Sequence, residues 1–209
     1  MVDRGEITAL ILAGGQSSRF QPAVSGGVHQ PAVDKGLVQW RGGALVAHVR
    51  QYLNNRVDPV WISANRNLHD YQCYGRVLKD DAIYGQYAGP LAGVATALRQ
   101  ITTPWLLTLP TDTPCLPESL IERLSEKVGA GVWLASAVTP AGAFPLCMLV
   151  HRSLFGSLHD ALIAGERKVQ AWQALAGGVQ VWFDAQGAEF FNVNTPQDLE
   201  TLSAAFVAP

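Results

Sequence analysis

The sequence predicts an α/β fold: a single-domain, doubly wound and mostly parallel sheet with helices on both faces. The length of 209 residues suits one compact domain, residues 1–209. A hydrophobic fraction of 48% and a charged fraction of 15% are typical of a globular protein with a sizeable core. Short apolar runs alternate along the chain with amphipathic stretches, and this alternation favours helices packed on both sides of a parallel sheet.

Four short apolar runs are predicted to be strands. Continuous apolar runs of this length suit strands that are buried on both faces of a parallel sheet. In chain order they occupy residues 7–12, 59–63, 105–109 and 132–136. A shorter strand is predicted at residues 77–78.

Amphipathic stretches between and after these runs are predicted to be helices. Pro90 is suited to the first turn of one helix. In another, apolar residues recur at helical spacing beside charged ones. Gly165 separates two further helices. The four helices are expected at residues 90–99, 120–128, 153–164 and 168–176.

A last helix is predicted to begin after Thr195 and to run through Phe206. A threonine hydroxyl can accept a hydrogen bond from the first turn of a helix, and Pro196 suits that turn. Asp198 falls at the third helical position, where a negative charge complements the helix dipole. We therefore expect a capped helix near the end of the sequence.

Composition excludes several classes of function. A net charge of −2 and a pI near 6.2 leave no electrostatic footprint for nucleic acid. Three scattered cysteines and five histidines match neither a disulfide framework nor a zinc site. The first apolar run is too short for a secretion signal, and no run approaches the ~18–20 residues of a membrane span. We expect a cytoplasmic protein that binds neither nucleic acid nor membranes.

Two glycines follow the first predicted strand, in the segment Leu12, Ala13, Gly14, Gly15. Glycine allows the backbone to approach a bulky anion closely, and successive N–H groups in such a turn can point at phosphate oxygens. Arg19 and, after a longer loop, Lys35 supply positive charge. The pattern indicates a phosphate-binding loop, although an ordinary glycine-rich turn has the same local sequence. The P-loop spacing and the dinucleotide-binding G-x-G-x-x-G spacing are both absent.

Asp112 follows the predicted strand at residues 105–109, in a turn between Pro110 and Pro114. A carboxylate on a fixed turn beside a phosphate loop is well placed to hold Mg²⁺, which usually takes only one or two carboxylates from the protein. An aspartate that merely closes its own turn is the competing interpretation.

The motifs together resemble a known family. Residues 12–15 with Ser18-Arg19 and Asp34-Lys35-Gly36 resemble the signature of the nucleotidyltransferase superfamily. Five further segments narrow the match: residues 63–66 (Ser-Ala-Asn-Arg), 89–93 (Gly-Pro-Leu-Ala-Gly), 110–114 (Pro-Thr-Asp-Thr-Pro), 165–168 (Gly-Glu-Arg-Lys) and 192–196 (Asn-Val-Asn-Thr-Pro). In this order, from about residue 7 to residue 202, they resemble the molybdenum cofactor guanylyltransferases, which join GMP to molybdopterin.

The resemblance implies a fold like that of the nucleotide-diphospho-sugar transferases, which is Rossmann-like, and Mg²⁺-dependent chemistry. The terminal phosphate of molybdopterin would attack the α-phosphorus of GTP and release pyrophosphate. The implied catalytic residues are Arg19, Lys35 and Asp112, with Asp112 as the metal ligand. Nucleotide binding is implied for Leu12, Ala13, Gly14, Gly15, Lys35, Ser63, Asn65, Asp80, Gly93 and Asp112. Acceptor binding is implied for Arg167, Lys168, Asn192 and Asn194, and other cofactor-biosynthesis proteins and molybdoenzyme chaperones are the implied protein partners.

Two departures from the family pattern affect these expectations. Ser63 stands where the alignment expects an asparagine that contacts guanine or ribose, and Asn65 could share that task. Residues 20–33 form a much longer link than usual between Arg19 and the Asp-Lys-Gly element, and we expect a mobile flap over the triphosphate. The placement of Lys35 depends on this link.

Several alternatives stay open. A related transferase could use CTP or another phosphorylated acceptor, and a non-catalytic protein could keep the fold to bind a nucleotide during assembly. Asp80 could be a solvated acid that pairs with Lys79 or Arg76. The Arg167-Lys168 pair could be a polar helix break instead of a phosphate clamp.

Overall fold

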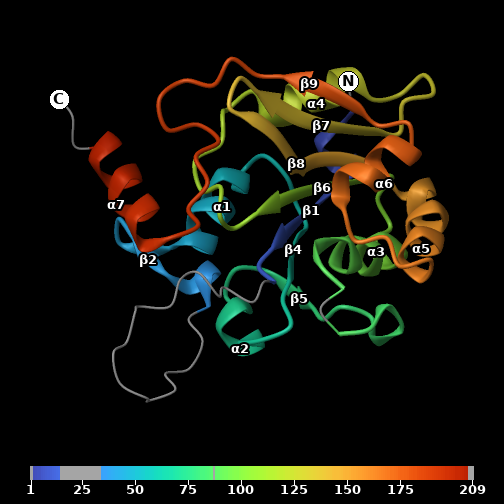
Figure 1. Ribbon diagram of the computed structural model, residues 1–209, viewed down its shortest axis with the longest axis horizontal. Coiled ribbons are helices and arrows are strands. Elements are labelled where there is room, and N and C mark those ends of the chain that lie inside the picture. Colours follow the sequence, from blue (N-terminus) through green and yellow to red (C-terminus); the bar gives the residue numbers. More distant parts are fainter. Residues whose placement is uncertain (1, 15–33, 87, 207–209) are drawn as a thin grey trace.

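The computed structural model describes residues 2–14, 34–86 and 88–206, and within them a central sheet of seven strands has helices on both faces (Figure 1). The sheet order is β5-β4-β1-β6-β8-β7-β9. Its strands are β1 (Ile7–Leu12), β4 (Val60–Ser63), β5 (Arg76–Leu78), β6 (Trp105–Pro110), β7 (Leu134–Thr139), β8 (Gly142–His151) and β9 (Val179–Trp182). A separate two-stranded ribbon pairs β2 (Gln39–Trp40) with β3 (Gly43–Ala44).

The helices alternate with the strands along the chain. They are α1 (Leu45–Leu53), α2 (Leu68–Tyr71), α3 (Pro90–Gln100), α4 (Leu120–Lys127), α5 (Phe155–Ile163), α6 (Val169–Leu175) and α7 (Pro196–Ala205). Short 3₁₀ turns lie at η1 (Arg4–Glu6), η2 (Lys35–Leu37), η3 (Ala82–Tyr84) and η4 (Arg152–Leu154). No helix in the described ranges has both the length and the apolar character that crossing a bilayer requires.

Pairing in the sheet is parallel except at one strand. β1 pairs in parallel with β4 and β6, β4 with β5, and β7 with β9. Among the described strands, β8 alone runs against its neighbours, and it pairs antiparallel with both β6 and β7. The predicted fold class, a mostly parallel α/β sheet covered on both faces, is confirmed.

Side chains of β1 alternate between two hydrophobic cores. Ile7, Ala9 and Ile11 join the core that α1 and α4 cover. Leu10 and Leu12 join the core on the other face, together with residues of α3, α5 and α6. All five are buried. Burial of a leucine or isoleucine side chain stabilises a fold by about 1.5–3 kcal/mol, so this strand is fixed from both sides.

A small third core seats α7 against the β2–β3 ribbon. Val193 and Leu202 are buried there with Trp40 and Leu45. The indole Nε1 of Trp40 also donates a hydrogen bond to the hydroxyl of Ser203, at 3.0 Å. The segment that leads into α7 is therefore held against the body of the domain.

The strand order changes direction at β1. The chain runs outward from β1 through β4 to β5 and then returns to β6 on the other side of β1. Leu12 pairs with Ser63 of β4 and with Pro110 of β6, so the carboxyl ends of the three strands coincide. Ligands of open α/β sheets bind in the crevice at such a switch point.

Most predicted elements are present, with small shifts in their bounds. The strand predicted at residues 132–136 is β7, which begins at Leu134, and the helix predicted at residues 153–164 divides into η4 and α5. Six helices and strands were not predicted: α1, α2, β2, β3, β8 and β9. α1 begins after Ala44 without a side-chain cap, and β8 contains Pro145, so both lack the usual local signals.

Gly75 offers a test of close packing in the sheet. A Cβ atom added there would lie 2.5 Å from the carbonyl oxygen of Val60, which belongs to the β4 backbone and cannot rotate away. We expect Gly75→Ala to lower the free energy of unfolding by about 1–3 kcal/mol, as overpacking usually does. Gly156, in α5, is the control, because nothing lies within 4 Å of an added Cβ. Gly156→Ala should leave stability unchanged or raise it by up to about 1 kcal/mol. Urea denaturation measures both, and equal stability of the two variants would contradict the close approach.

Candidate functional site

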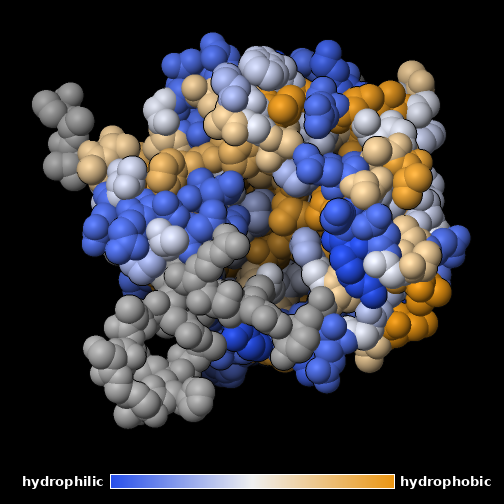
Figure 2. Space-filling view, viewed as in Figure 1, coloured by the Kyte–Doolittle hydropathy of each residue, from blue (hydrophilic) through white to orange (hydrophobic). Residues whose placement is uncertain are grey.

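A cavity of about 560 Å³ opens at the carboxyl ends of β1 and β4. Its lining includes six of the residues predicted to bind nucleotide: Leu12, Ala13, Gly14, Ser63, Asn65 and Asp80. Asp34 and the first residues of α3 also line it. Figure 2 shows a hollow near the centre of the face that Figure 1 presents, with hydrophobic residues at its floor and hydrophilic residues to its left and right. The volume lies in the range of small-molecule sites.

Backbone hydrogen bonds fix the turn after β1. The N–H of Ala13 donates to the carbonyl of Ser63 at 2.9 Å. The carbonyl of Leu12 accepts from the N–H of Thr111 at 3.2 Å and from its hydroxyl at 3.4 Å. Gly14 does not have a positive φ, and an added Cβ would meet only ordinary contacts, so it offers open space beside the cavity instead of an unusual backbone.

Three of the predictions concern residues that the structure does not describe. They are Gly15, Arg19 and the long link at residues 20–33. Their predicted roles stay predictions.

One carboxylate, that of Asp80, gathers the polar side chains at the end of β4. The amide of Asn65 donates to Asp80 Oδ2 at 2.7 Å, and its oxygen accepts from the Asp80 N–H at 3.0 Å. The hydroxyl of Ser63 donates to Asp80 Oδ1 at 3.3 Å. Burial raises the pKa of Asp80, and the hydrogen bonds from Asn65 and Ser63 partly oppose that rise.

The alternative of a solvated Asp80 paired with a nearby cation is not what the structure shows. Arg76 instead stacks on Trp61, with its guanidinium carbon 4.4 Å from the ring centroid, and donates to Gln100 at 3.0 Å. Asp80 is half-buried and lines the cavity.

Gly93 lies behind this cluster, in α3. A Cβ atom added there would come well inside 3.0 Å of the Ser63 hydroxyl and would lie 3.2 Å from Asp80 Oδ1. Gly93 is buried and is not among the residues that line the cavity. Its position supports the Ser63–Asp80 contact, whereas direct contact with a nucleotide stays a prediction.

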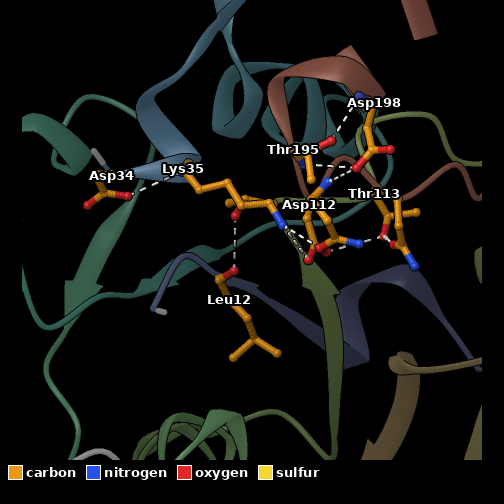
Figure 3. A network of polar contacts seen from close by, with 11 residues as sticks. Leu12, Asp34, Lys35, Asp112, Thr113, Thr195 and Asp198 are labelled. Atoms are coloured by element: carbon orange, nitrogen blue, oxygen red, sulfur yellow. Dashed lines mark hydrogen bonds and ion pairs between the residues drawn. The ribbon is translucent and has the colours of Figure 1, made fainter. Parts of the chain in front are cut away.

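Lys35 joins three segments of the chain beside the end of β6. Its ammonium group lies 3.0 Å from Asp112 Oδ2 and 2.8 Å from the amide oxygen of Asn194 (Figure 3). The N–H of Val193 donates to the carbonyl of Asp112 at 2.8 Å, and Thr113 donates to Asn192 at 2.7 Å. The predicted residues Lys35, Asp112, Asn192 and Asn194 therefore form one cluster.

The cap of α7 orients this cluster. Thr195 and Asp198 form a capping box, which confirms the predicted start of the last helix (Figure 3). Asp198 Oδ2 also accepts the N–H groups of Asn194 and Thr195, each at 2.8 Å. The hydrogen bond from the Asn194 N–H is the main reason why the pKa of Asp198 is lowered. The helix cap thus fixes the backbone of a residue that contacts Lys35.

The donor set beside Asp112 is suited to a hard cation. One carboxylate and the amide oxygens of Asn192 and Asn194 meet there. Within residues 2–14, 34–86 and 88–206, no group of three or more His, Cys, Asp or Glu side chains could hold a metal alone. Mg²⁺ needs no such group, because waters and substrate phosphates complete its shell. The Lys35 ammonium group lies 3.0 Å from Asp112 Oδ2, so a positive charge already faces this carboxylate.

Arg167 is engaged with backbone carbonyls. Its guanidinium donates to Leu162 O at 2.7 Å, to Glu166 O at 2.9 Å and to Tyr84 O at 3.3 Å. It therefore fastens the loop between α5 and α6 to η3. The loop borders the cavity, because an added Cβ at Gly89 would lie 4.0 Å from the Arg167 carbonyl.

Lys168, the other predicted acceptor ligand, is exposed and caps α6. Its N–H and that of Arg167 both donate to Glu166 Oε1, at 2.7 and 2.8 Å, and these two bonds lower the pKa of Glu166. The binding of the acceptor phosphate by Arg167 and Lys168 stays a prediction.

The sequence interpretation did not assign roles to Asp34 and Thr113. Asp34 lines the cavity and caps the turn that carries Lys35, whereas Thr113 links Asp112 to Asn192. Both lie inside motifs that the sequence pattern singled out. The sequence interpretation assigned roles to the adjacent charged residues instead, namely Lys35 after Asp34 and Asp112 before Thr113.

Residues 9–179 match the MobA-like NTP transferase domain. The molybdenum cofactor guanylyltransferase of Acidovorax ebreus is 38% identical over 216 residues, which cover 97% of each chain. That of Cupriavidus taiwanensis is 38% identical over 98% of this chain and all of its own length. Among solved structures, molybdopterin-guanine dinucleotide biosynthesis protein A from Archaeoglobus fulgidus has a TM-score of 0.71 at 20% identity and covers 94% of this chain and 97% of its own. The chain therefore belongs to the MobA-like NTP transferase family.

Proposed function

We propose that this protein transfers GMP from GTP to the terminal phosphate of molybdopterin and releases pyrophosphate. The product is the guanine dinucleotide form of the molybdenum cofactor. Family membership over nearly the full chain supports the activity. The observation that carries it structurally is the contact of Lys35 with Asp112 and Asn194, beside a nucleotide-sized cavity at the switch point of the sheet.

The reaction asks little of the protein in acid–base chemistry. The attacking phosphate of the acceptor is already anionic, so no strong general base is needed. A bond forms between its oxygen and the α-phosphorus of GTP, and the bond from that phosphorus to the β-phosphate oxygen breaks. Positioning and charge stabilisation supply most of the rate in such transfers. Lys35, with Arg19, would neutralise the departing pyrophosphate.

Nucleotidyltransferases typically use a divalent metal, and we assign Mg²⁺ to Asp112. The amide oxygens near Asp112 are compatible ligands. When bound, Mg²⁺ supplies positive charge that offsets the charge of the triphosphate. Asp112 contributes a carboxylate held on a short turn after β6, where the N–H of Val193 anchors its backbone.

The end of β4 would bind the nucleoside. Asp80 lines the cavity, and Asn65 holds it by donating to its carboxylate and accepting from its backbone N–H. A carboxylate accepts hydrogen bonds from paired N–H or O–H donors, and both guanine and ribose offer them. Ser63, shorter than an asparagine, reaches Asp80 and leaves room for a base or a bridging water.

The acceptor would bind beside Asp112. Arg167, Lys168, Asn192 and Asn194 are the residues we assign to it: the two asparagines lie near Lys35 and Asp112, and the Arg167–Lys168 loop borders the cavity. We further propose that residues 1–209 form one domain. We also propose that the enzyme is cytoplasmic, since the three cysteines in the described residues are free thiols. Cofactor-biosynthesis proteins and molybdoenzyme chaperones are its proposed protein partners.

Two other functions remain as outcomes of the tests. The phosphate machinery does not read the base, so a CTP-dependent enzyme would use the same Lys35–Asp112 pair. A non-catalytic nucleotide-binding protein would not need that pair at all, and its presence argues against this function.

The first test is the choice of base. With Mg²⁺ present, GTP should bind at least tenfold more tightly than CTP, a difference of about 1.4 kcal/mol. A site with buried donors and acceptors leaves some of them unpaired when the wrong base enters. Isothermal titration with GTP, CTP and ATP measures the difference. Equal affinity for GTP and CTP would overturn the guanylyl assignment and keep the transferase fold.

The second test separates binding from stability at Asp80. Because burial raises the pKa of Asp80, the folded protein loses stability as pH rises from the ordinary aspartate range through this raised pKa. Asp80→Asn removes that loss, so its free energy of unfolding at pH 7 should exceed that of the wild type. The same variant should bind GTP roughly tenfold more weakly, because the loss of one good acceptor costs about 1.4 kcal/mol.

Asp81→Asn is the matched control for Asp80. Asp81 is the next residue, and it pairs with Arg99 at 2.8 Å. Its variant should lose at most about 1 kcal/mol of stability and keep its GTP affinity. Chemical denaturation and titration calorimetry measure both pairs of values. An Asp80→Asn protein with wild-type GTP affinity would exclude Asp80 from the binding site.

The third test concerns Asp112. Asp112→Asn keeps the size of the side chain and its ability to form a turn, and removes the charge that a magnesium site requires. Turnover should fall by roughly 10²–10³, the loss typical of one strong electrostatic element in a transition-state site. High Mg²⁺ should restore part of the rate in this variant and hardly any in Lys35→Ala. Pyrophosphate release reports the rate.

Asp70→Asn is the control for Asp112, because Asp70 is an exposed acid in α2. It should have wild-type turnover and magnesium dependence. If Asp112→Asn also turns over at a normal rate at ordinary Mg²⁺, Asp112 is only a turn residue.

A further inference from the structure

We propose that Tyr71 is a positioning residue for Lys35, and that its buried hydroxyl acts through the carboxylate of Asp34. The inference rests on the proposed function, because it assigns phosphate binding to Lys35. Tyr71 belongs to the core of the domain and is not among the residues that line the cavity. Four features of the described structure carry it.

The first feature is the set of donors around Asp34. The hydroxyl of Tyr71 donates to Asp34 Oδ1 at 2.6 Å, and the amide of Asn67 donates to Oδ2 at 2.9 Å. The N–H of Gly36 donates to Oδ1 at 3.2 Å. Asp34 is thus the cap of η2, the short turn that begins with Lys35. Its orientation is set from outside the turn by two side chains of the α2 region.

The second feature is the rigidity of Tyr71. Its side chain is fully buried in the core between the sheet and α1. Burial, together with the nearby Asp34 carboxylate, raises the pKa of Tyr71, so the phenol stays protonated and remains a donor. A core side chain packed at this density has one position, and Asp34 is therefore tied to a fixed point of the domain.

The third feature is the space that Gly36 leaves. A Cβ atom added at Gly36 would come well inside 3.0 Å of the Tyr71 hydroxyl and would lie 3.4 Å from Cγ2 of Thr111. Only glycine lets η2 lie between these two residues. Thr111 directly precedes Asp112, so this packing sets the distance from the backbone of Lys35 to the metal-binding carboxylate.

The fourth feature is the reach of Lys35 itself. Its ammonium group contacts Asp112 and Asn194, which are 77 and 159 residues away along the chain. A lysine side chain has many rotamers, so its head is well placed only when its backbone is fixed. Tyr71, through Asp34, supplies that fixed backbone.

Tyr71→Phe tests the inference with the packing retained. The hydroxyl is lost, and Asp34 keeps only the donors from Asn67 and Gly36. GTP·Mg²⁺ affinity should fall roughly tenfold, because the proposed function places Lys35 against the β- and γ-phosphates. GMP affinity should change by less than about twofold, because GMP lacks those phosphates. Titration calorimetry of the full chain measures both.

Tyr52→Phe is the matched control. Tyr52 is a partly buried tyrosine that packs against the same core as Tyr71, and its hydroxyl donates to the carbonyl of Pro117 at 3.1 Å, away from the cavity. Tyr52→Phe should lower the free energy of unfolding in urea about as much as Tyr71→Phe does. Its GTP and GMP affinities should both equal those of the wild type.

A double-mutant cycle shows whether Tyr71 acts through Lys35. In a Lys35→Ala background, Tyr71→Phe should cause no further loss of GTP affinity. The proposal would be overturned if Tyr71→Phe lowered the affinities for GTP and GMP equally. It would also be overturned if Tyr71→Phe lowered GTP affinity as much in the Lys35→Ala background as in the wild type. Either result would mean that Tyr71 only supports the fold.

Hydrogen exchange in the ligand-free protein keeps this test independent of the proposed function. The amides of Gly36 and Leu37 should exchange at least tenfold faster in Tyr71→Phe than in the wild type, and unchanged exchange there overturns the positioning role. A wild-type protein that fails to bind GTP·Mg²⁺ overturns the proposed function instead. In that event the exchange rates still decide whether Tyr71 holds the turn.

Discussion

The contact of the Lys35 ammonium group with Asp112 and Asn194 is the interaction on which the rest of the site depends. It joins three segments: the turn η2, the end of β6 and the segment before α7. A lysine here satisfies a carboxylate and an amide oxygen at once, and the side chains of Lys35 and Asp112 are only partly exposed to solvent. Without that charge, the Asp112 carboxylate and the Asn194 amide oxygen would lose the donor that they share. The three segments therefore keep their places because each provides part of one electrostatic cluster.

Each part of the cluster is held by structure that lies outside it. The capping box of α7 fixes Asn194, and the buried Val193 seats that segment in the third core while bonding Asp112. On the opposite side, Gly36 fits between Tyr71 and Thr111. The same logic applies to the nucleoside end, where Gly93 leaves room for Ser63 to reach Asp80. The chemistry-bearing side chains are few, and the residues that place them are small or buried.

The sequence predicted the features that are encoded locally. Continuous apolar runs revealed β1 and β6, and the turn between Pro110 and Pro114 revealed Asp112. Thr195 and Asp198 revealed the start of α7, because a capping box needs only neighbours in sequence. The antiparallel direction of β8 was not predictable, since direction in a sheet depends on partners far along the chain. The three carbonyls bound by Arg167 and the Tyr71–Asp34 hydrogen bond were hidden for the same reason.

The distance along the chain between Lys35 and Asn194 has a consequence for synthesis. These residues are 159 positions apart, whereas Asp34, Asn67, Tyr71 and Asp112 all lie in the first half of the chain or just beyond it. Domains fold as units, and the end of β6 leaves the ribosome well before α7. The Lys35–Asn194 contact can therefore form only after most of the chain has been made. A prematurely ended chain would lack Asn192 and Asn194, and with them one of the two oxygen partners of the Lys35 ammonium group.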